Sequence, residues 1–246
     1  MNEAKKVAVV VGGSRGIGAA VVRLLAQAGY GVVFSYASNA ASAEAVAASV
    51  TSSGGQAIAI KADSASEADL VSLFEQAQAS GPIGALVYSA GITGQASPLA
   101  DVSAETLERV IAVNLTGAML AAREGVRRMA RSRGGSGGGI VFISSRATAY
   151  GSPGEYVWYA ASKGGIDSLM TGLAKEVGGD GIRVNCVSPG PVATDMLSAE
   201  RLAVGAARVP MKRAGEAEEV AKAVLYLLSQ DASYVNGANL AVSGGV

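Results

Sequence analysis

The sequence predicts a doubly wound α/β fold, in which a parallel sheet is covered by helices on both faces. Short β-branched runs alternate with longer amphipathic segments from end to end of the chain. Most of the short runs are continuously apolar, as expected for strands that are buried on both faces. This alternation indicates βαβ units, whose right-handed crossovers place helices on both sides of the sheet. The 246 residues, half of them hydrophobic, fit one domain over 1–246.

The elements follow from these runs in chain order. The first strand is the run Val-Ala-Val-Val-Val before a Gly-Gly pair, and each later strand is a similar run after an Ala-rich or Leu-rich amphipathic segment. A flexible turn is expected at 134–139, and a less regular segment at 192–213, after a strand end, is expected to be a substrate lid. The expected strands are 6–11, 31–36, 56–61, 85–89, 140–144, 183–187 and 239–242. The expected helices are 17–28, 39–53, 66–79, 103–131, 157–177 and 216–229.

Composition excludes several kinds of chemistry. There is no histidine, which excludes a Ser-His-Asp triad, a Cys-His nucleophile and a His-based zinc site. The single cysteine, Cys186, excludes an internal disulfide and thiolate metal clusters, so no metal site is expected. Twenty basic residues balance twenty acidic ones, which argues against a nucleic-acid or anionic-membrane surface. Acid–base chemistry must therefore come from Tyr, Lys, Asp or Glu.

No targeting or membrane segment is expected. The first apolar run, at 7–11, is too short for the core of a signal peptide. No apolar stretch approaches the eighteen or so residues of a membrane span. The sequence therefore predicts a soluble, cytoplasmic protein.

A glycine-rich loop joins the first strand to the first helix. Glycine lets the backbone turn tightly and approach a pyrophosphate, whose charge the helix N-terminus then stabilises. The spacing is Gly-x-x-x-Gly-x-Gly, and its position in a βαβ unit favours a dinucleotide site over an ordinary tight turn. The loop comprises Gly12, Gly13, Ser14, Arg15, Gly16, Ile17 and Gly18.

The end of the second strand favours NADP(H) over NAD(H). An acidic residue about twenty positions after the loop would hold the ribose of NAD, but no carboxylate occurs there before Glu44. Arg15 is instead available for a 2′-phosphate, with Ser38 and Asn39 as neutral donors. The alternative is that Arg15 is a solvated loop cation. Asp63, after the third strand, is expected to bind the adenine amine or to cap a helix.

Tyr159 and Lys163 lie four residues apart in an expected helix, so both project from one face. A free tyrosine has a pKa of about 10, too high for efficient acid–base work at neutral pH. An ammonium about 5 Å away lowers that pKa by roughly two units. Spacing alone is also compatible with a solvated surface pair.

Several motifs together resemble the short-chain dehydrogenase/reductase family. The resemblance covers essentially the whole chain and implies a Rossmann fold with a seven-stranded parallel sheet. Within the family the chain is most similar to the β-ketoacyl-ACP reductase and glucose-dehydrogenase-like group. The motifs are the glycine loop, Asn114, Ser144-Ser145, Tyr-x-x-x-Lys at 159–163, Ser188-Pro189-Gly190 and the ending Ser243-Gly244-Gly245.

The resemblance implies a role for each matching position. Tyr159 would exchange a proton with the substrate oxygen, and Ser145 would hydrogen-bond that oxygen. Lys163 would lower the pKa of Tyr159 and bind the nicotinamide ribose. Asn114 would anchor a proton-relaying water, or be a buried amide satisfied by its own helix. The implied cofactor-binding residues are Gly12, Ser14, Arg15, Gly16, Ile17, Gly18, Ser38, Asn39, Asp63, Ser64, Ala90, Gly91, Tyr159, Lys163, Pro189, Gly190, Val192 and Thr194.

The sequence departs from the family pattern in three ways. Val11 stands in place of a threonine, and Tyr88-Ser89 in place of Asn-Asn. Since the usual polar groups tie two central strands together, we expect lower sheet stability or a shifted cofactor pocket. Ser145 precedes Tyr159 by fourteen residues where thirteen is common, which leaves Ser144 as a minor candidate for the catalytic serine.

These features predict an NADPH-dependent oxidoreductase that transfers hydride between nicotinamide and a ketone or secondary alcohol. A β-ketoacyl-ACP reductase and a xenobiotic or sugar ketone reductase both fit. Tyr150, Tyr156 and Trp158 are expected to line an apolar pocket or an interface, and 92–95 the opposite wall. A non-catalytic NADP-binding sensor or scaffold is the main rival. A lyase such as a halohydrin dehalogenase is disfavoured, because those relatives carry arginine in place of Lys163.

The resemblance also implies a homotetramer, with the 103–131 and 157–177 helices pairing across one interface and the C-terminal segment forming another. Five arginines gather at the end of the 103–131 segment. We interpret them as ordinary cations near a helix C-terminus rather than as a nucleic-acid site. They are Arg123, Arg127, Arg128, Arg131 and Arg133.

Overall fold

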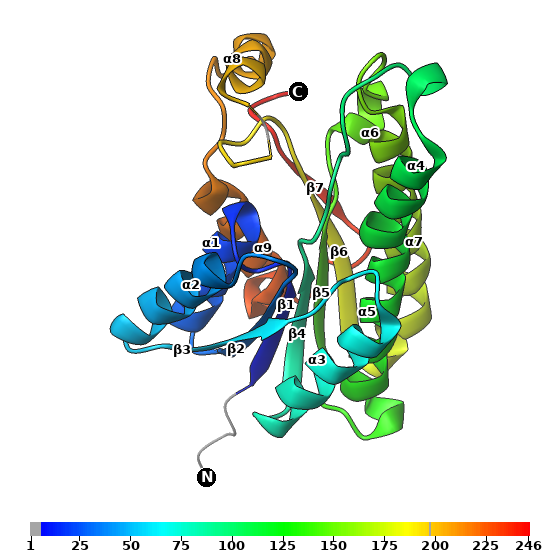
Figure 1. The fold of residues 1–246 in the computed structure, drawn as a ribbon. Coiled ribbons are helices and arrows are strands. Elements are labelled where there is room, and N and C mark those ends of the chain that lie inside the picture. The colour runs from blue at the N-terminus through cyan, green and yellow to red at the C-terminus, as the bar shows by residue number, and fades with distance from the viewer. Residues whose placement is uncertain (1–5, 197) are drawn as a thin grey trace.

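Seven parallel strands form one sheet in the computed structural model, which describes residues 6–196 and 198–246 (Figure 1). The strand order is β3-β2-β1-β4-β5-β6-β7, so the order reverses between β1 and β4. All seven expected strands are present, within two residues of their expected ends. They are β1 (Val7–Val11), β2 (Gly31–Tyr36), β3 (Gln56–Lys61), β4 (Ile83–Tyr88), β5 (Gly138–Ile143), β6 (Ile182–Pro189) and β7 (Asn239–Val242).

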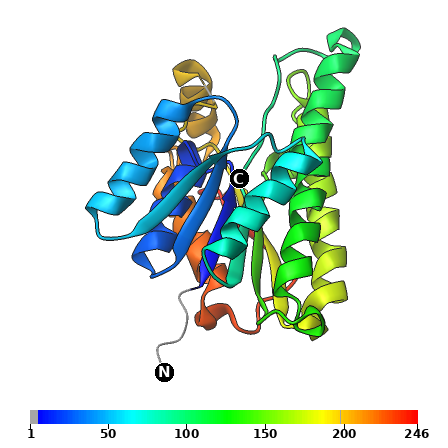
Figure 2. The same ribbon diagram turned by 60° about the horizontal axis from the view of Figure 1, so that its bottom comes forward.

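Helices cover both faces of the sheet, as the doubly wound prediction requires (Figures 1 and 2). Each face has its own buried apolar cluster, because the strands are apolar on both sides. One face carries α1 (Gly16–Gln27), α2 (Ala40–Ser52) and α9 (Ala217–Leu228). The other carries α3 (Glu67–Ala79), α4 (Ala104–Ile111), α5 (Gly117–Met129) and α7 (Val157–Val177).

Two segments differ from their predictions. The expected 103–131 helix contains a π-helical turn, Ala112–Thr116, between α4 and α5. The segment at 192–213, expected to be less regular, contains the helix α8 (Ala199–Arg208), which begins where the Ser198 hydroxyl accepts a hydrogen bond from the Arg201 amide. Leu197 of this segment lies outside the described residues.

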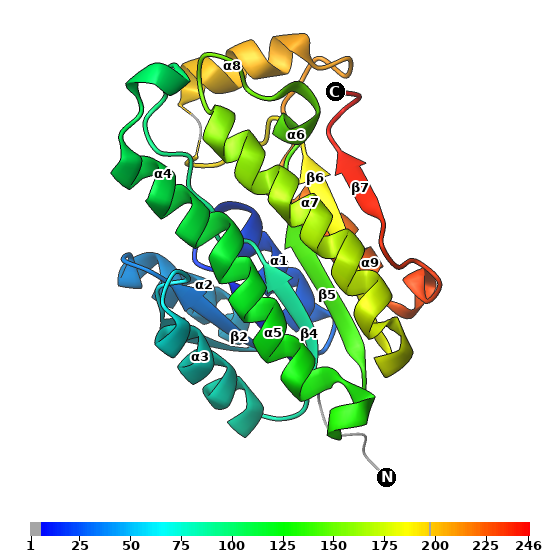
Figure 3. The ribbon, with the colours of Figure 1, turned by 90° about the vertical axis from the view of Figure 1, so that its right-hand side faces the viewer.

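The carboxyl ends of the strands meet at one edge of the sheet, where α8 and the short helix α6 (Ala147–Tyr150) also lie (Figure 3). In open α/β sheets, ligands bind outside these ends, at the point where the strand order reverses. The β1–β4 reversal therefore places the glycine loop after β1 beside the residues that follow β4. Within the described residues, no helix is long and apolar enough to cross a membrane.

Candidate active site

The glycine loop is shaped by contacts that leave no room for side chains. Gly12 has a φ of +83°, and a Cβ there would lie 2.7 Å from the backbone nitrogen of Ala90. A Cβ on Gly13 would lie 2.6 Å from Cβ of Phe34, and one on Gly18 would collide with the Gly12 carbonyl oxygen. The Arg15 side chain makes no capping hydrogen bond at the start of α1, whose first turn contains no acidic residue. The loop is therefore a close cradle at a helix N-terminus, which suits a phosphate group.

The residues expected around an adenosine 2′-phosphate lie on the surface beside this loop. Arg15 and Ser38 are exposed. Asn39 also lies there, but its side-chain oxygen caps α2 by accepting a hydrogen bond from the Ser42 amide at 3.0 Å. The side-chain oxygen of Asn39 therefore has a structural role that the sequence interpretation did not include.

Asp63 does not cap α3, and its carboxylate is already paired with other groups. The cap of α3 is Ser66. Arg109 donates to both carboxylate oxygens of Asp63, at 2.9 and 3.2 Å, and the Ala65 amide donates to one of them. Although burial acts in the other direction, these partners hold the pKa of Asp63 below its usual value. Ser64, the next residue, is buried and hydrogen-bonds the Tyr88 side chain.

Tyr159 lies on α7 with its side chain beside Ser145, which follows β5. The two side chains hydrogen-bond, and Ser145 Oγ also accepts from the Ala147 amide at 3.1 Å. Burial nevertheless raises the pKa of Tyr159 above its usual value, and the bond to Ser145 only partly offsets this. The expectation that the pKa of Tyr159 is lowered is therefore wrong for this structure, because desolvation of the phenolate outweighs the favourable contacts.

Lys163 lies one helical turn after Tyr159 and is almost completely buried. Its ammonium donates to the Ile143 carbonyl oxygen at 2.7 Å and lies 5.8 Å from the centre of the Tyr159 ring. Burial lowers the pKa of Lys163 to about 8. Lys163 is thus buried and Tyr159 partly buried, so the two are not a solvated surface pair.

Asn114 lies in the π-helical turn, fully buried. Its side chain accepts from the Ile92 amide at 2.8 Å, and donates to the Ile92 carbonyl at 2.9 Å and to Ser162 Oγ at 3.0 Å. The amide is thus satisfied by the segment after β4 and by α7, not by its own helix. Gly91 lies against both Asn114 and Lys163: a Cβ there would be 3.6 Å from Asn114 Oδ1 and 3.5 Å from Lys163 Nζ. The four sequence-predicted catalytic residues therefore come together.

The two adjacent serines have different surroundings. Ser144 is buried, and its hydroxyl donates to Asp167 Oδ1 at 2.6 Å. Ser145 is less buried and hydrogen-bonds Tyr159. The geometry thus favours Ser145 over Ser144 as the serine that meets a substrate.

The other predicted cofactor residues border the same edge of the sheet. Pro189 ends β6, and Gly190 is held by the Val242 carbonyl at 3.1 Å, so close to Ser243 that a Cβ would clash. Val192 is buried, and a Cβ on Gly16 would lie 3.2 Å from the methyl group of Thr194. The segment after β6 therefore reaches back to the glycine loop.

The departures from the family pattern are accommodated by other bonds. The Ser89 amide donates to the Val11 carbonyl at 2.9 Å, so the ends of β1 and β4 remain tied through the backbone. The Tyr88 hydroxyl donates to the Val113 carbonyl of the π-helical turn at 2.5 Å. Tyr88 thus links the end of β4 to the turn that carries Asn114.

The aromatic loop is mostly occupied by contacts of its own. The Trp158 indole, 4% exposed, donates to the Thr93 carbonyl at 2.7 Å. Tyr156 is stacked by Arg201 of α8, whose guanidinium lies 4.9 Å from the ring centre and donates to the Tyr156 hydroxyl. Tyr150 is 59% exposed. Of the three aromatic residues, only Tyr150 is free to line an open pocket. Sequence reasoning missed Arg201, for which the chain offered no local signal.

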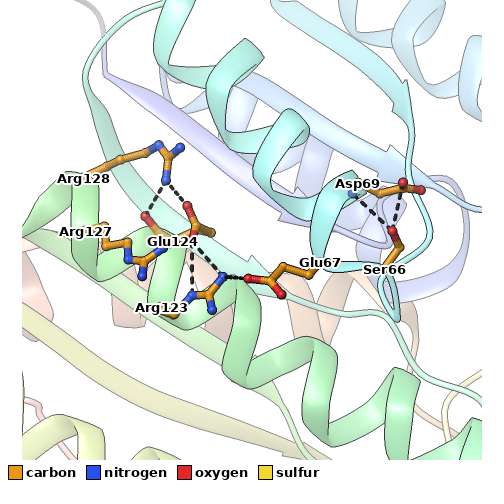
Figure 4. A network of polar contacts seen from close by, with 7 residues as sticks. All are labelled: Ser66, Glu67, Asp69, Arg123, Glu124, Arg127 and Arg128. Carbon is orange, nitrogen blue, oxygen red and sulfur yellow. Dashed lines mark hydrogen bonds and ion pairs between the residues drawn. The ribbon is translucent and has the colours of Figure 1, made fainter.

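The arginine cluster surrounds one buried carboxylate (Figure 4). Glu124, 3% exposed at its side chain, pairs with Arg123, Arg127 and Arg128 at 3.2, 2.8 and 2.5 Å. Arg123 also pairs with Glu67 of α3 at 2.6 Å. The arginines hold the pKa of Glu124 below its usual value despite its burial. These cations join α5 to α3, in addition to lying near a helix C-terminus.

Comparison with known proteins identifies the family. A family described as enoyl-(acyl carrier protein) reductase matches residues 11–246. An Escherichia coli protein named uncharacterized oxidoreductase YgfF is 47% identical over 244 residues, covering 97% of this chain and 99% of its own. An Arabidopsis thaliana protein named NADPH-dependent aldehyde reductase-like protein, chloroplastic, is 37% identical over 258 residues, covering 98% of this chain and 94% of its own.

A solved structure agrees with these relatives. It is a short-chain dehydrogenase/reductase from Serratia marcescens, 39% identical, with a TM-score of 0.91. The match covers 98% of this chain and 97% of the Serratia chain. With its Rossmann-like parallel sheet and these relatives, the chain belongs to the short-chain dehydrogenase/reductase family of oxidoreductases.

Proposed function

We propose that this protein is an NADPH-dependent carbonyl reductase that also runs in reverse as an alcohol dehydrogenase. One observation carries the proposal: Tyr159, hydrogen-bonded to Ser145 and next to the buried Lys163, lies at the strand ends that also hold the glycine loop. A sensor without turnover would need the cradle but would have no use for this proton-transfer pair. Asn114, which is buried in the same site, also supports the enzyme over the sensor.

The residues around the loop fit NADP(H). The glycines form a close cradle at the N-terminus of α1, and Arg15 and Ser38 lie exposed beside it. The described end of β2 offers no carboxylate that would repel a 2′-phosphate. A relative at 37% identity is named as NADPH-dependent. When bound, NADPH supplies the hydride.

The protein's own residues handle the proton and the charge. Tyr159, whose raised pKa keeps it protonated at neutral pH, donates its hydroxyl proton to the oxygen of the carbonyl as that oxygen gains negative charge. Ser145 hydrogen-bonds the same oxygen. Lys163, as an ammonium, stabilises the tyrosinate that remains. In alcohol oxidation the same groups act in the opposite direction.

The rim of the site favours a substrate with apolar surface. Tyr150 is exposed next to Tyr159, close enough to raise the pKa of the latter. Met196 and Met211, on the segment that contains α8, are exposed by 49% and 61%. We therefore favour an apolar or aromatic ketone over a keto-sugar, with a β-ketoacyl thioester as the second candidate.

The test is the loss of NADPH absorbance, with NADH in parallel, over a panel of carbonyl compounds. The panel contains an aryl ketone, a diketone, a β-ketoacyl thioester, a keto-sugar and a steroid ketone. We expect turnover with NADPH on an apolar ketone. NADPH binding without turnover on any compound would favour the sensor.

Cofactor preference depends on Arg15. Arg15→Ala should weaken NADPH binding about 10- to 100-fold, because a charge-assisted bond to the 2′-phosphate is lost, and leave NADH binding almost unchanged. Fluorescence titration of the two cofactors measures both constants. Arg133→Ala, which removes the same charge at the opposite end of the sheet, is the control. Equal loss of both affinities would contradict the assignment.

We also propose that the chain forms a homotetramer, in which the outer face of α4 and α5 forms one interface and the C-terminal segment forms another. Ile111 and Met119 are exposed by 37% and 45% on this face. Leu107, Glu108, Ile111, Ala112 and Thr116 line a mostly apolar groove there. A second copy of α4 and α5 would cover these side chains.

A further inference from the structure

The row of functional side chains on α7 continues beyond the Tyr–Lys pair. Tyr159, Lys163 and Asp167 follow one another at intervals of four residues, which places them along one face of the helix. Asp167 is partly buried, one turn beyond Lys163. The proposed function uses the first two residues and assigns nothing to the third.

Asp167 is fastened to the ends of two strands. Its Oδ1 accepts from the Ser144 hydroxyl, at the end of β5, at 2.6 Å and from Asn239 Nδ2, at the start of β7, at 3.0 Å. Asn239 Oδ1 in turn accepts from the Ser188 hydroxyl of β6 at 2.7 Å. Because Ser144 directly precedes Ser145, the carboxylate fixes the point at which the proposed substrate-binding serine leaves the sheet.

Asp167 also acts electrostatically on Lys163, as does Cys186. The groups that act on Lys163 are the Ile143 carbonyl of β5, Cys186 of β6 and Asp167 of its own helix, with the Tyr159 ring nearby. Burial raises the pKa of the Cys186 thiol far above its usual value, so that thiol is uncharged at neutral pH. Tyr159 is uncharged there as well, since its pKa is also raised. Asp167 therefore supplies the negative charge that opposes the desolvation of Lys163.

We propose that Asp167 is a positioning residue: its carboxylate holds the strand end that carries Ser145 and keeps Lys163 an ammonium beside Tyr159. The inference rests on the proposed function for its catalytic meaning. The charge relation between Asp167 and Lys163 can be tested in the protein without cofactor or substrate.

The test is a pH titration of the protein by NMR, with lysine labelled with ¹³C at Cε. The Lys163 resonance is identified by its loss in Lys163→Met. In Asp167→Asn, which keeps the shape and removes the charge, the pKa of Lys163 should fall by about one pH unit. Asp167→Glu, which keeps the charge, should restore most of the value.

Glu176→Gln is the matched control, because it removes one carboxylate from the exposed end of the same helix. It should leave the Lys163 titration unchanged. Asp167→Ser, smaller and also neutral, repeats the test if Asp167→Asn does not fold, and circular dichroism establishes the fold of each variant. The same fall is expected in both neutral variants.

Activity gives the second readout. The rate of carbonyl reduction should fall as the pH rises through the pKa of Lys163. In Asp167→Asn this fall should occur about one pH unit lower. The KM for NADPH should be unchanged. A Lys163 pKa that is equal in the parent and in a folded, neutral Asp167 variant would overturn the inference, whether or not the protein reduces carbonyls. Lack of turnover in the parent would overturn the proposed function and leave the titration result standing.

Discussion

Lys163 is a cation held in a position that disfavours charge. Only 4% of its surface is exposed, and the Ile143 carbonyl is its one hydrogen-bond acceptor among the described residues. Folding lowers its pKa from the ordinary 10.5 to about 8, so the folded protein binds this proton less tightly than the unfolded chain does. The free energy of unfolding therefore increases as the pH rises from about 8 to 10.5. Below pH 8 the full penalty for the buried charge is present.

Removing this charge should stabilise the protein and abolish its activity. Lys163→Met should raise the free energy of unfolding at pH 7 by up to about 3 kcal/mol, less the cost of the unpaired Ile143 carbonyl. Urea denaturation at pH 7 and at pH 10 measures the change, which should shrink at the higher pH. Lys175→Met, on the exposed side of the same helix, is the control. A variant less stable than the parent at pH 7 would show that the buried charge does not destabilise the fold.

Single residues also show how far the sequence could be interpreted. The spacing of Tyr159 and Lys163 was sufficient to place them together, because four residues make about one helical turn. The direction of the pKa change at Tyr159 was not predictable, since it depends on burial by other parts of the chain. The partner of Asp63 was not predictable either, because Arg109 lies 46 positions away.

At the scale of elements, α8 is fastened over the site by Arg201. Its guanidinium stacks on Tyr156 and pairs with Glu155 at 3.1 Å. The loop that contains these two residues leads directly into α7, and the Glu155 carbonyl accepts from the Ser97 amide after β4 at 3.1 Å. Three connections that follow different strands therefore meet at the carboxyl edge, with α8 outermost (Figure 3).

Loss of the Arg201 contacts should weaken substrate binding more than it slows the chemical step. Arg201→Ala removes one cation–π contact and a partly exposed ion pair, so KM for the carbonyl substrate should rise about tenfold while kcat changes less. Steady-state kinetics gives the split, and hydrogen exchange of α8 should become faster. Arg208→Ala, in the last turn of the same helix, is the control. Unchanged KM and exchange would mean that Arg201 does not hold α8.

The assembly proposal belongs to the outer face of α4 and α5. Ile111→Glu combined with Met119→Glu should convert the tetramer into smaller species, because charges would be buried in an apolar interface. Light scattering at micromolar concentration reports the mass. Ile58→Glu, at a similarly exposed position on the edge strand β3, is the control. A monomeric mass for the parent protein would refute the tetramer.

Elements were predictable in proportion to how regular their patterns are. The strands and the long helices were predicted within a few residues because continuous apolar runs alternate with amphipathic ones. The helix α8 was missed because it begins soon after a proline-bounded loop and has no fully buried residue. The π-helical turn was missed because it depends on tertiary bonds of Tyr88 and Asn114.

At the scale of the whole molecule, a sheet buried on both faces gathers distant residues at one edge. The glycine loop follows β1, Ser145 follows β5, and Tyr159 and Lys163 come from α7. Their convergence follows from the parallel direction of the strands, which brings all carboxyl ends together. The alternation predicted the parallel sheet, and the resemblance to the family predicted which residues would meet at its edge. It did not predict which loops would close over it, because these depend on individual side chains such as Arg201.

The central claim is that the protein transfers a hydride from NADPH to a carbonyl carbon with Tyr159 as the proton donor. The most direct test uses NADPH with deuterium in both C4 positions of the nicotinamide and the best ketone of the panel. The parent protein should place one deuterium on the carbinol carbon of the alcohol for each NADPH consumed, measured by mass spectrometry. Tyr159→Phe should bind NADPH almost equally well and form this product about a thousandfold more slowly, whereas Tyr226→Phe on α9 should not differ. Near-normal transfer by Tyr159→Phe, or alcohol without deuterium, would contradict the claim.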